Sequence, residues 1–246
     1  MLYIGTSGWA YPSWKPDFFP PETKSKDFLR YYSTRLNATE VNYTFRRLVT
    51  EKALAQWIAD TPKDFRFVLK AHYFMTHVRR LKDAEEPIER FFTSIGPMIA
   101  SGRMGPVFFQ LPPNFKADVP RLRDFLAQLP DGLQYAWEFR HESWFTDETY
   151  EVLADFNSSL CIAENEKTVT PNLLTAGFAY YRFRQPKYSR PTLKKIAERL
   201  HALAEKRDAY AFFKHEEDPR SALWAATALK FARTLGGNSP AGKKVR

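Results

Sequence analysis

Three residues that can do chemistry stand close together near the middle of the chain. Glu138, Arg140 and His141 end an aromatic, strand-like run that begins at Tyr135. Side chains two positions apart share a face of a strand, so Glu138 and Arg140 point the same way. An ion pair that closes the strand end explains this pattern as well as a reactive site does, because buried charges are normally paired.

Other strand-like runs end in the same way. Glu40, Lys70, Gln110, Glu164 and Arg182 lie within or at the edge of apolar runs, where an unpaired charge is costly to bury. We therefore expect one shared polar pocket. Further polar and aromatic residues near the ends of these runs, including candidate substrate-binding residues, are Ser7, Trp9, Tyr11, Asn42, His77, Trp144, Lys214, His215 and Glu216.

The elements that must position these side chains alternate between strands and helices. Strands are expected at 1–8, 38–45, 65–70, 106–111, from 135, and at 160–164, 178–183 and 209–214. Helices are expected at 26–36, 51–59, 88–99, 119–128, 147–156, 192–206 and 220–235. This alternation over 246 residues predicts one α/β domain, a (β/α)8 TIM barrel over 1–235, followed by a disordered basic tail at 236–246.

Two features qualify the barrel prediction. No convincing full helix lies between Glu164 and Phe178, so we expect an irregular connection after the sixth strand. A doubly wound open sheet is the alternative, but Gly5-Thr6-Ser7-Gly8 does not match its glycine-rich phosphate loop.

Charge and cysteine content limit the classes of protein. The net charge of +9 suggests an anionic partner such as nucleic acid or a phosphorylated substrate, although a solvated basic surface explains it equally. A single cysteine, Cys161, in an apolar run predicts a buried inert thiol in a reducing compartment, hence a cytoplasmic protein. No apolar stretch reaches membrane-spanning length, so no membrane partner is expected.

The residues at the strand ends suggest roles. Glu138 and Glu40 are candidate acid–base groups or ligands of a divalent metal, and His141 has the pKa range for proton transfer. Lys70, a further candidate catalytic residue, can with Arg140 and Arg182 hold a phosphate or carboxylate. A salt-bridge network closing the barrel is the alternative for each. No local metal motif and no Gly-x-Ser-x-Gly elbow is present, but a metal site assembled from several strands would leave no such motif.

Five motifs in chain order resemble the YecE-like family (domain of unknown function 72). They are Ile4-Gly5-Thr6-Ser7-Gly8-Trp9, Glu40-Val41-Asn42-Tyr43-Thr44-Phe45-Arg46, Phe67-Val68-Leu69-Lys70-Ala71, Gln110-Leu111-Pro112-Pro113 and Glu138-Phe139-Arg140-His141. The resemblance implies a TIM barrel and no established activity. The chain departs from the family pattern at Arg182-Phe183-Arg184-Gln185 and at Phe213-Lys214-His215-Glu216.

Two classes of function follow. The first is an enzyme of the hydrolase or lyase type that acts on an anionic or phosphorylated substrate at the C-terminal face of the barrel. The alternative is a non-catalytic nucleic-acid-binding protein. This class is suggested by the basic segment Arg79-Arg80-Leu81-Lys82 and by nearby aromatic residues. A metal-dependent, nuclease-like barrel would combine the two.

Overall fold

Eight parallel strands form a closed barrel in the computed structural model of the chain, which describes residues 1–164, 170–214 and 217–237. Neighbouring strands pair in sequence order, and β1 pairs with β8 to close the barrel. The strands are β1 (Leu2–Ser7), β2 (Ala38–Val41), β3 (Arg66–Lys70), β4 (Met104–Gln110), β5 (Tyr135–Glu138), β6 (Ser159–Ala163), β7 (Phe178–Phe183) and β8 (Asp208–Phe213). The predicted TIM barrel is confirmed.

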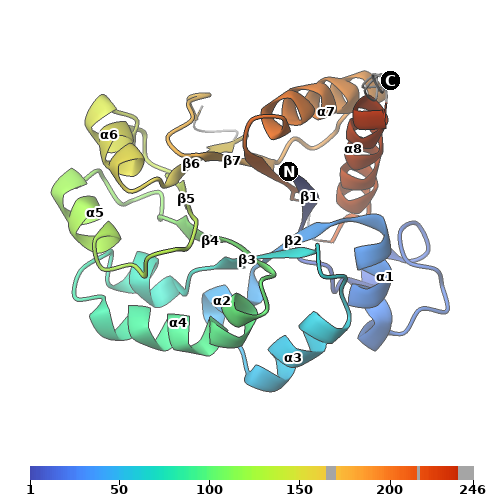
Figure 1. The fold of residues 1–246 in the computed structure, drawn as a ribbon, viewed down its shortest axis with the longest axis horizontal. Coiled ribbons are helices and arrows are strands. Elements are labelled where there is room, and N and C mark those ends of the chain that lie inside the picture. The colour runs from blue at the N-terminus through green and yellow to red at the C-terminus, as the bar shows by residue number, and fades with distance from the viewer. Residues whose placement is uncertain (165–169, 215–216, 238–246) are drawn as a thin grey trace, which may run out of the picture.

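Helices surround this barrel as a ring (Figure 1). The α-helices are α1 (Phe28–Arg35), α2 (Tyr43–Arg46), α3 (Glu51–Ala59), α4 (Glu85–Ala100), α5 (Val119–Leu126), α6 (Asp147–Asp155), α7 (Arg190–Ala204) and α8 (Arg220–Gly237). Shorter helical turns are η1 (Pro12–Trp14), η2 (Ser25–Asp27), the π-helical η3 (Phe74–Val78) and η4 (Glu142–Trp144). None of the helices in the described ranges combines the length and apolar character needed to cross a bilayer.

The connection from β6 to β7 has no helix in its described residues, 164 and 170–177. In Figure 1 this arc of the ring holds a loop between α6 and α7. The described part of the connection agrees with the irregular connection predicted after the sixth strand. At the C-terminal end, Gly236 and Gly237 belong to α8, and the rest of the predicted tail lies outside the described residues.

One predicted strand is shorter than expected. The alternation over 38–45 suggested a strand throughout, but β2 ends at Val41 and residues 43–46 form α2. The hydroxyl of Thr44 accounts for the turn, because it donates to the carbonyl oxygens of Val41 (3.1 Å) and Lys70 (2.7 Å). These contacts hold the helical turn against the ends of β2 and β3.

Several helices start at a side chain that accepts a backbone N–H. Thr50, Asp118, Thr146 and Ser189 each precede a helix and accept from the residue three positions later. Such caps satisfy donors that have no partner within the first turn of a helix. The helix starts are therefore encoded locally.

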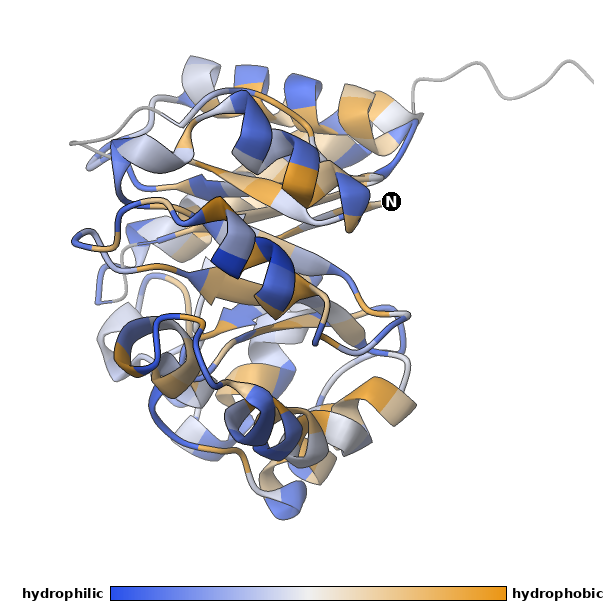
Figure 2. Cartoon of the chain, turned by 90° about the vertical axis from the view of Figure 1, so that its left-hand side faces the viewer, coloured by the Kyte–Doolittle hydropathy of each residue, from blue (hydrophilic) through white to orange (hydrophobic). Residues whose placement is uncertain are grey.

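The apolar side chains form two layers. One fills the space between strands and helices, and the other fills the barrel interior, where Tyr3 stacks on Tyr210 and Phe108 stacks on Tyr180. Figure 2 shows hydrophobic residues along the strands and mixed colouring on the helices around them. The barrel is thus a packed core rather than a channel.

Polar residues replace the interior apolar residues at the C-terminal ends of the strands. Because a strand has a period of two, the residue two positions after an interior side chain also points inward. The resulting pairs of interior apolar and polar residues are Ala38 and Glu40, Val68 and Lys70, Phe108 and Gln110, Ala136 and Glu138, and Tyr180 and Arg182.

Candidate functional site

Arg182 is the centre of the polar layer. Its fully buried guanidinium donates from Nη2 to Glu40 Oε1 (2.7 Å) and from Nη1 to Glu138 Oε2. Its guanidinium carbon lies over the ring of Phe108, 4.6 Å from the ring centroid. Arg182 therefore joins the ends of β2, β5 and β7 through one side chain.

Glu40 is enclosed by donors. The hydroxyl of Ser7 donates to Oε1 (2.7 Å) and that of Tyr180 donates to Oε2 (2.7 Å). Burial by itself raises the pKa of a carboxyl, but Arg182 and these hydroxyls outweigh that effect and lower the pKa of Glu40. Glu40 is therefore an anion at neutral pH.

Glu138 receives three guanidinium groups. Besides Arg182, Arg140 donates from Nε to Oε1 (3.1 Å), and Arg184 donates from Nη2 to Oε2 (2.9 Å). Burial raises the pKa of Glu138, but Arg182, Arg184 and Arg140 together hold it well below the usual range. The predicted ion pair with Arg140 is present, within a larger network. An ionised Glu138 can accept a proton but has none to donate.

Lys70 joins this network through Gln110. Its Nζ donates to Gln110 Oε1 (2.9 Å), and Gln110 Nε2 donates to Glu138 Oε1 (2.9 Å). The ammonium also lies over the ring of Phe45, 4.1 Å from its centroid. Burial and the nearby Arg182 lower the pKa of Lys70 to about 7, so that its amine is poised to gain or lose a proton at neutral pH.

The cluster reaches solvent at two of its cations. The side chain of Arg140 is 29% exposed and that of Arg184 is 16% exposed. The Nε–H groups of Arg182 and Arg184 are buried and have no hydrogen-bond partner among the described residues. Burial and the proximity of Arg182 lower the pKa of Arg184, which means that a further negative charge here would be favourable.

His77 lies beside this cluster, on η3. Its Nδ1 is 2.8 Å from the hydroxyl of Thr76, and its ring meets the ring of Phe45 edge-on. Burial and the surrounding cations, Lys70 first and Arg140 next, lower the pKa of His77 to about 4. His77 is therefore a neutral imidazole at the edge of a positive region.

Two predicted site residues lie elsewhere. Trp144 is fully buried: its ring stacks on Phe139, and its Nε1 donates to the carbonyl oxygen of Phe115 (2.7 Å). Both its ring and its donor are used in packing, and contact between Trp144 and substrate stays a prediction. His141 caps η4, where its Nδ1 accepts the N–H of Ser143 (3.2 Å).

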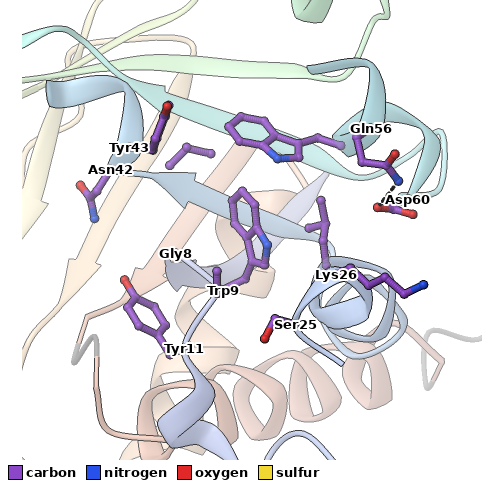
Figure 3. A pocket seen from close by; sticks show the side chains of 13 residues that line it. Gly8, Trp9, Tyr11, Ser25, Lys26, Asn42, Tyr43, Gln56 and Asp60 are labelled. Atoms are coloured by element: carbon purple, nitrogen blue, oxygen red, sulfur yellow. Dashed lines mark hydrogen bonds between the residues drawn. The ribbon is translucent and has the colours of Figure 1, made fainter. Parts of the chain in front are cut away.

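Three predicted substrate-binding residues, Trp9, Tyr11 and Asn42, line a separate pocket of about 440 Å³ (Figure 3). The pocket lies beside the ends of β1 and β2. Two short hydrogen bonds join the pocket lining to residues of the charged cluster: the hydroxyl of Tyr11 donates to the carbonyl oxygen of Ser7 (3.0 Å), and the N–H of Gly8 donates to that of Glu40 (2.8 Å). The structure thus divides the predicted set into a charged cluster and an aromatic pocket.

The end of β8 is only partly described. Lys214 continues the strand, with its N–H bonded to the carbonyl oxygen of Phe183 (2.9 Å), and it contributes to lowering the pKa of Lys70. His215 and Glu216 lie outside the described residues. Within the described ranges, no group of three or more histidine, cysteine, aspartate or glutamate side chains is arranged to hold a metal ion. The divalent metal stays a prediction.

Sequence reasoning missed two members of the cluster, Arg184 and Tyr180. The period-two rule that links Glu138 with Arg140 also places Arg184 on the same inward face of its strand as Arg182. The same rule places Tyr180 one step below Arg182. Extending the strand past its last apolar residue would have found Arg184.

A closed barrel of this kind, with a buried charged cluster at its C-terminal strand ends, defines a TIM-barrel protein. The chain belongs to the family described as Protein of unknown function DUF72, whose sequence model matches residues 3–244. The resemblance to the YecE-like family is thereby confirmed.

Relatives support the same assignment. UPF0759 protein YunF of Bacillus subtilis is 32% identical over 63% of this chain and 56% of its own length. UPF0759 protein YecE of Escherichia coli is 30% identical over 59% of this chain and 50% of its own length. The chain thus matches about half the length of each. The crystal structure of a DUF72 family protein from Thermotoga maritima has a TM-score of 0.83 and 28% identity, covering 96% of this chain and 99% of that one.

Proposed function

We propose that this chain is an enzyme of the hydrolase or lyase type that acts on a small anionic substrate, such as a phosphorylated one, at the C-terminal face of its barrel. One observation carries the proposal: among the residues that the structure describes, the ion pairs of the buried cluster bring together more positive than negative charges. Three guanidinium groups, from Arg140, Arg182 and Arg184, meet two carboxylates, from Glu40 and Glu138. A protonated Lys70 adds a further positive charge. Desolvated charge of one sign favours a ligand of the other sign.

The anion would contact Arg140 and Arg184. These are the guanidinium groups of the cluster that solvent reaches, whereas Arg182 is fully enclosed. Arg184 also has an unused Nε–H to offer to an oxyanion oxygen. Arg182 would act as a positioning residue, since it holds both carboxylates in place.

Lys70 would carry the proton. A lysine with a pKa of about 7 is part amine and part ammonium at neutral pH, which suits general acid–base catalysis. Glu138, ionised and joined to Lys70 through Gln110, would stabilise the ammonium form.

Anion binding tests the proposal directly. Titration calorimetry with inorganic phosphate, pyrophosphate and a phosphate monoester should show saturable binding to the wild-type chain. Arg140→Ala should weaken binding at least about tenfold, because it removes a charge-assisted hydrogen bond. Arg123→Ala is the matched control, since Arg123 forms an ion pair with Asp155 on the helical surface.

The stability of Arg140→Ala should stay close to that of the wild type, because this side chain is partly exposed. Absence of saturable binding for all three anions would contradict the proposal. Equal affinity in wild type and Arg140→Ala would also contradict it. A loss of stability without a loss of binding would indicate that the network only holds the barrel together.

Nucleic-acid binding is the second candidate, and a distinct feature favours it. Arg46 lies over Tyr73 (5.1 Å), Arg79 over Phe74 (5.5 Å) and Arg80 over Phe115 (5.9 Å), measured from the guanidinium carbon to the ring centroid. These residues follow β2, β3 and β4 and therefore lie at the face of the cluster. Arginines held on aromatic rings suit contacts with phosphates and bases.

Salt dependence distinguishes this candidate. Binding of a labelled single-stranded oligonucleotide, followed by fluorescence anisotropy, should weaken steeply with salt if the arginines contact phosphates. Arg79→Ala should reduce the slope of log affinity against log salt by about 1. A flat salt response, or no binding at moderate ionic strength, would rule out this role. Cys161 is a buried free thiol, which supports placing either function in a reducing compartment such as the cytoplasm.

A further inference from the structure

The pocket beside β1 and β2 has the size and lining of a small-molecule site. Its volume of about 440 Å³ falls in the range of ligand pockets. The indoles of Trp9 and Trp57 are both half-buried and meet edge-on, with their ring centroids 5.2 Å apart. Leu29 and Val41 add apolar surface to the lining. Large aromatic surface left partly open to water is favourable to cover.

The polar groups of the pocket lie on two sides. Figure 3 shows Tyr11, Asn42 and Tyr43 on one side of Trp9, and Gln56 and Asp60 on the other. Asp60 is already engaged: Gln56 Nε2 donates to it (2.8 Å), and Arg30 donates to it from outside the pocket (2.7 Å). Lys26 lines the pocket on the same side, but it is exposed, so solvent screens its charge.

Asn42 differs from these groups. Its Nδ2 atom is buried and has no hydrogen-bond partner among the described residues, and its side chain makes no cap bond to α2. A buried amide donor without a partner is unfavourable, and a ligand that brings an acceptor relieves it. Asn42 lines the pocket, and a bound acceptor would meet this donor once the amide turns about its last torsion angle.

Backbone geometry shapes the same wall. Gly8 has a φ of +87°, which favours glycine, and a Cβ there would lie 2.5 Å from the Tyr11 hydroxyl. The missing side chain lets the Tyr11 ring approach the end of β1, where its hydroxyl is bonded to Ser7. The segment that follows β1 and forms this pocket wall is thus anchored to the end of the strand.

We propose that this pocket binds a planar, uncharged aromatic ring system that carries a carbonyl-type hydrogen-bond acceptor. The rings would pack against Trp9 and Trp57, and the acceptor would receive the amide N–H of Asn42. The inference does not depend on the anion site, because none of the cluster residues Glu40, Lys70, Glu138 and Arg182 lines the pocket.

Quinolin-2-one is a suitable probe, since it is planar, bicyclic and neutral and has one carbonyl. Calorimetric titration should show saturable one-to-one binding to the full chain. Indole, which has a similar ring system without the acceptor, should bind about tenfold more weakly. Asn42→Leu should weaken the binding of quinolin-2-one by a similar factor and leave the affinity for indole unchanged. Asn42→Leu removes no cap bond, so its thermal unfolding should match that of the wild type.

Blocking the entrance provides the structural control. Ser25 is exposed and lines the pocket, so Ser25→Trp should abolish binding of both probes without altering the core. Lys195 on α7 is exposed and does not line the pocket, so the Lys195→Trp variant should bind quinolin-2-one with wild-type affinity. Arg140→Ala should also bind it normally, which separates this result from the anion test. No saturable binding, or equal binding in Ser25→Trp, would overturn the proposal.

Discussion

The ammonium group of Lys70 shows how single residues set the properties of this site. It is buried, faces the ring of Phe45 and shares its surroundings with Arg182, so its charged form is disfavoured. The carboxylates of Glu40 and Glu138 act in the opposite direction but do not fully compensate. A bound anion would shift this balance toward the protonated amine.

Sulfate affinity should therefore depend on the protonation of Lys70. Sulfate does not titrate near neutrality, and the pKa of His77 is about 4. Neither group therefore changes its charge between pH 6 and 9, and neither adds to the pH dependence of sulfate affinity in that range. The affinity should fall at least about tenfold as the pH rises over this range, because the deprotonated amine contributes no charge. Calorimetric titration of wild type and Lys70→Met should show the fall only in the wild type. A parallel fall in both would exclude Lys70 as the cause.

At the scale of elements, the pairing register of β1 and β2 places Ser7 beside Glu40, and α1 supports this pair of strands. Ser7 and Glu40 are aligned across β1 and β2. Tyr32 of α1 fixes this pair of strands, because its hydroxyl accepts the N–H of Thr6 (2.9 Å) and donates to the carbonyl oxygen of Ala38 (2.9 Å). Burial raises the pKa of Tyr32 to about 12, so the hydroxyl keeps its proton.

This arrangement requires glycine at position 5. A Cβ on Gly5 would lie 1.8 Å from the carbonyl oxygen of Ala38 and 2.9 Å from the Tyr32 hydroxyl. Gly5→Ala should lower the free energy of unfolding by about 2 kcal/mol or more, since the strands must separate locally. Gly96→Ala, in α4 with open space around it, should instead stabilise by up to about 1 kcal/mol. Urea denaturation measures both; a neutral Gly5→Ala would contradict the close approach.

At the scale of the whole molecule, a parallel barrel gathers every strand end at one face. The contact between Arg182 and Glu40 spans 142 residues of sequence, and that between Arg182 and Glu138 spans 44. Burying this cluster makes global stability depend on pH, because the folded and unfolded states bind different numbers of protons.

Stability should rise with pH above neutrality. In the unfolded chain Lys70 keeps its proton up to a pKa of about 10.4, whereas in the folded chain it loses it near 7. Between these values the unfolded state binds more protons, so the free energy of unfolding increases by up to about 1.4 kcal/mol per pH unit. Urea denaturation at pH 7, 8 and 9 should show this increase relative to Lys70→Met. Equal slopes in the two proteins would indicate that Lys70 titrates normally.

The sequence by itself determined the barrel and the residue types at its mouth. Strand and helix periods are local properties, and the caps at Thr50 and Ser189 mark helix starts without tertiary information. Polar residues at the ends of apolar strands predicted the buried cluster, because a charge in such a run needs a partner. The prediction of a strand over residues 42–45 was wrong, since the bond of Thr44 to Lys70 depends on the neighbouring strand β3.

Only the tertiary structure decided which residues meet. Closing the barrel brings Arg182 between Glu40 and Glu138, adds Arg184, and leaves the cluster with an excess of positive charge. It also buries Trp144 and moves Trp9, Tyr11 and Asn42 into a separate pocket. These outcomes depend on contacts between distant segments and on side-chain packing, whereas a one-dimensional pattern specifies only which face of its own strand a residue occupies.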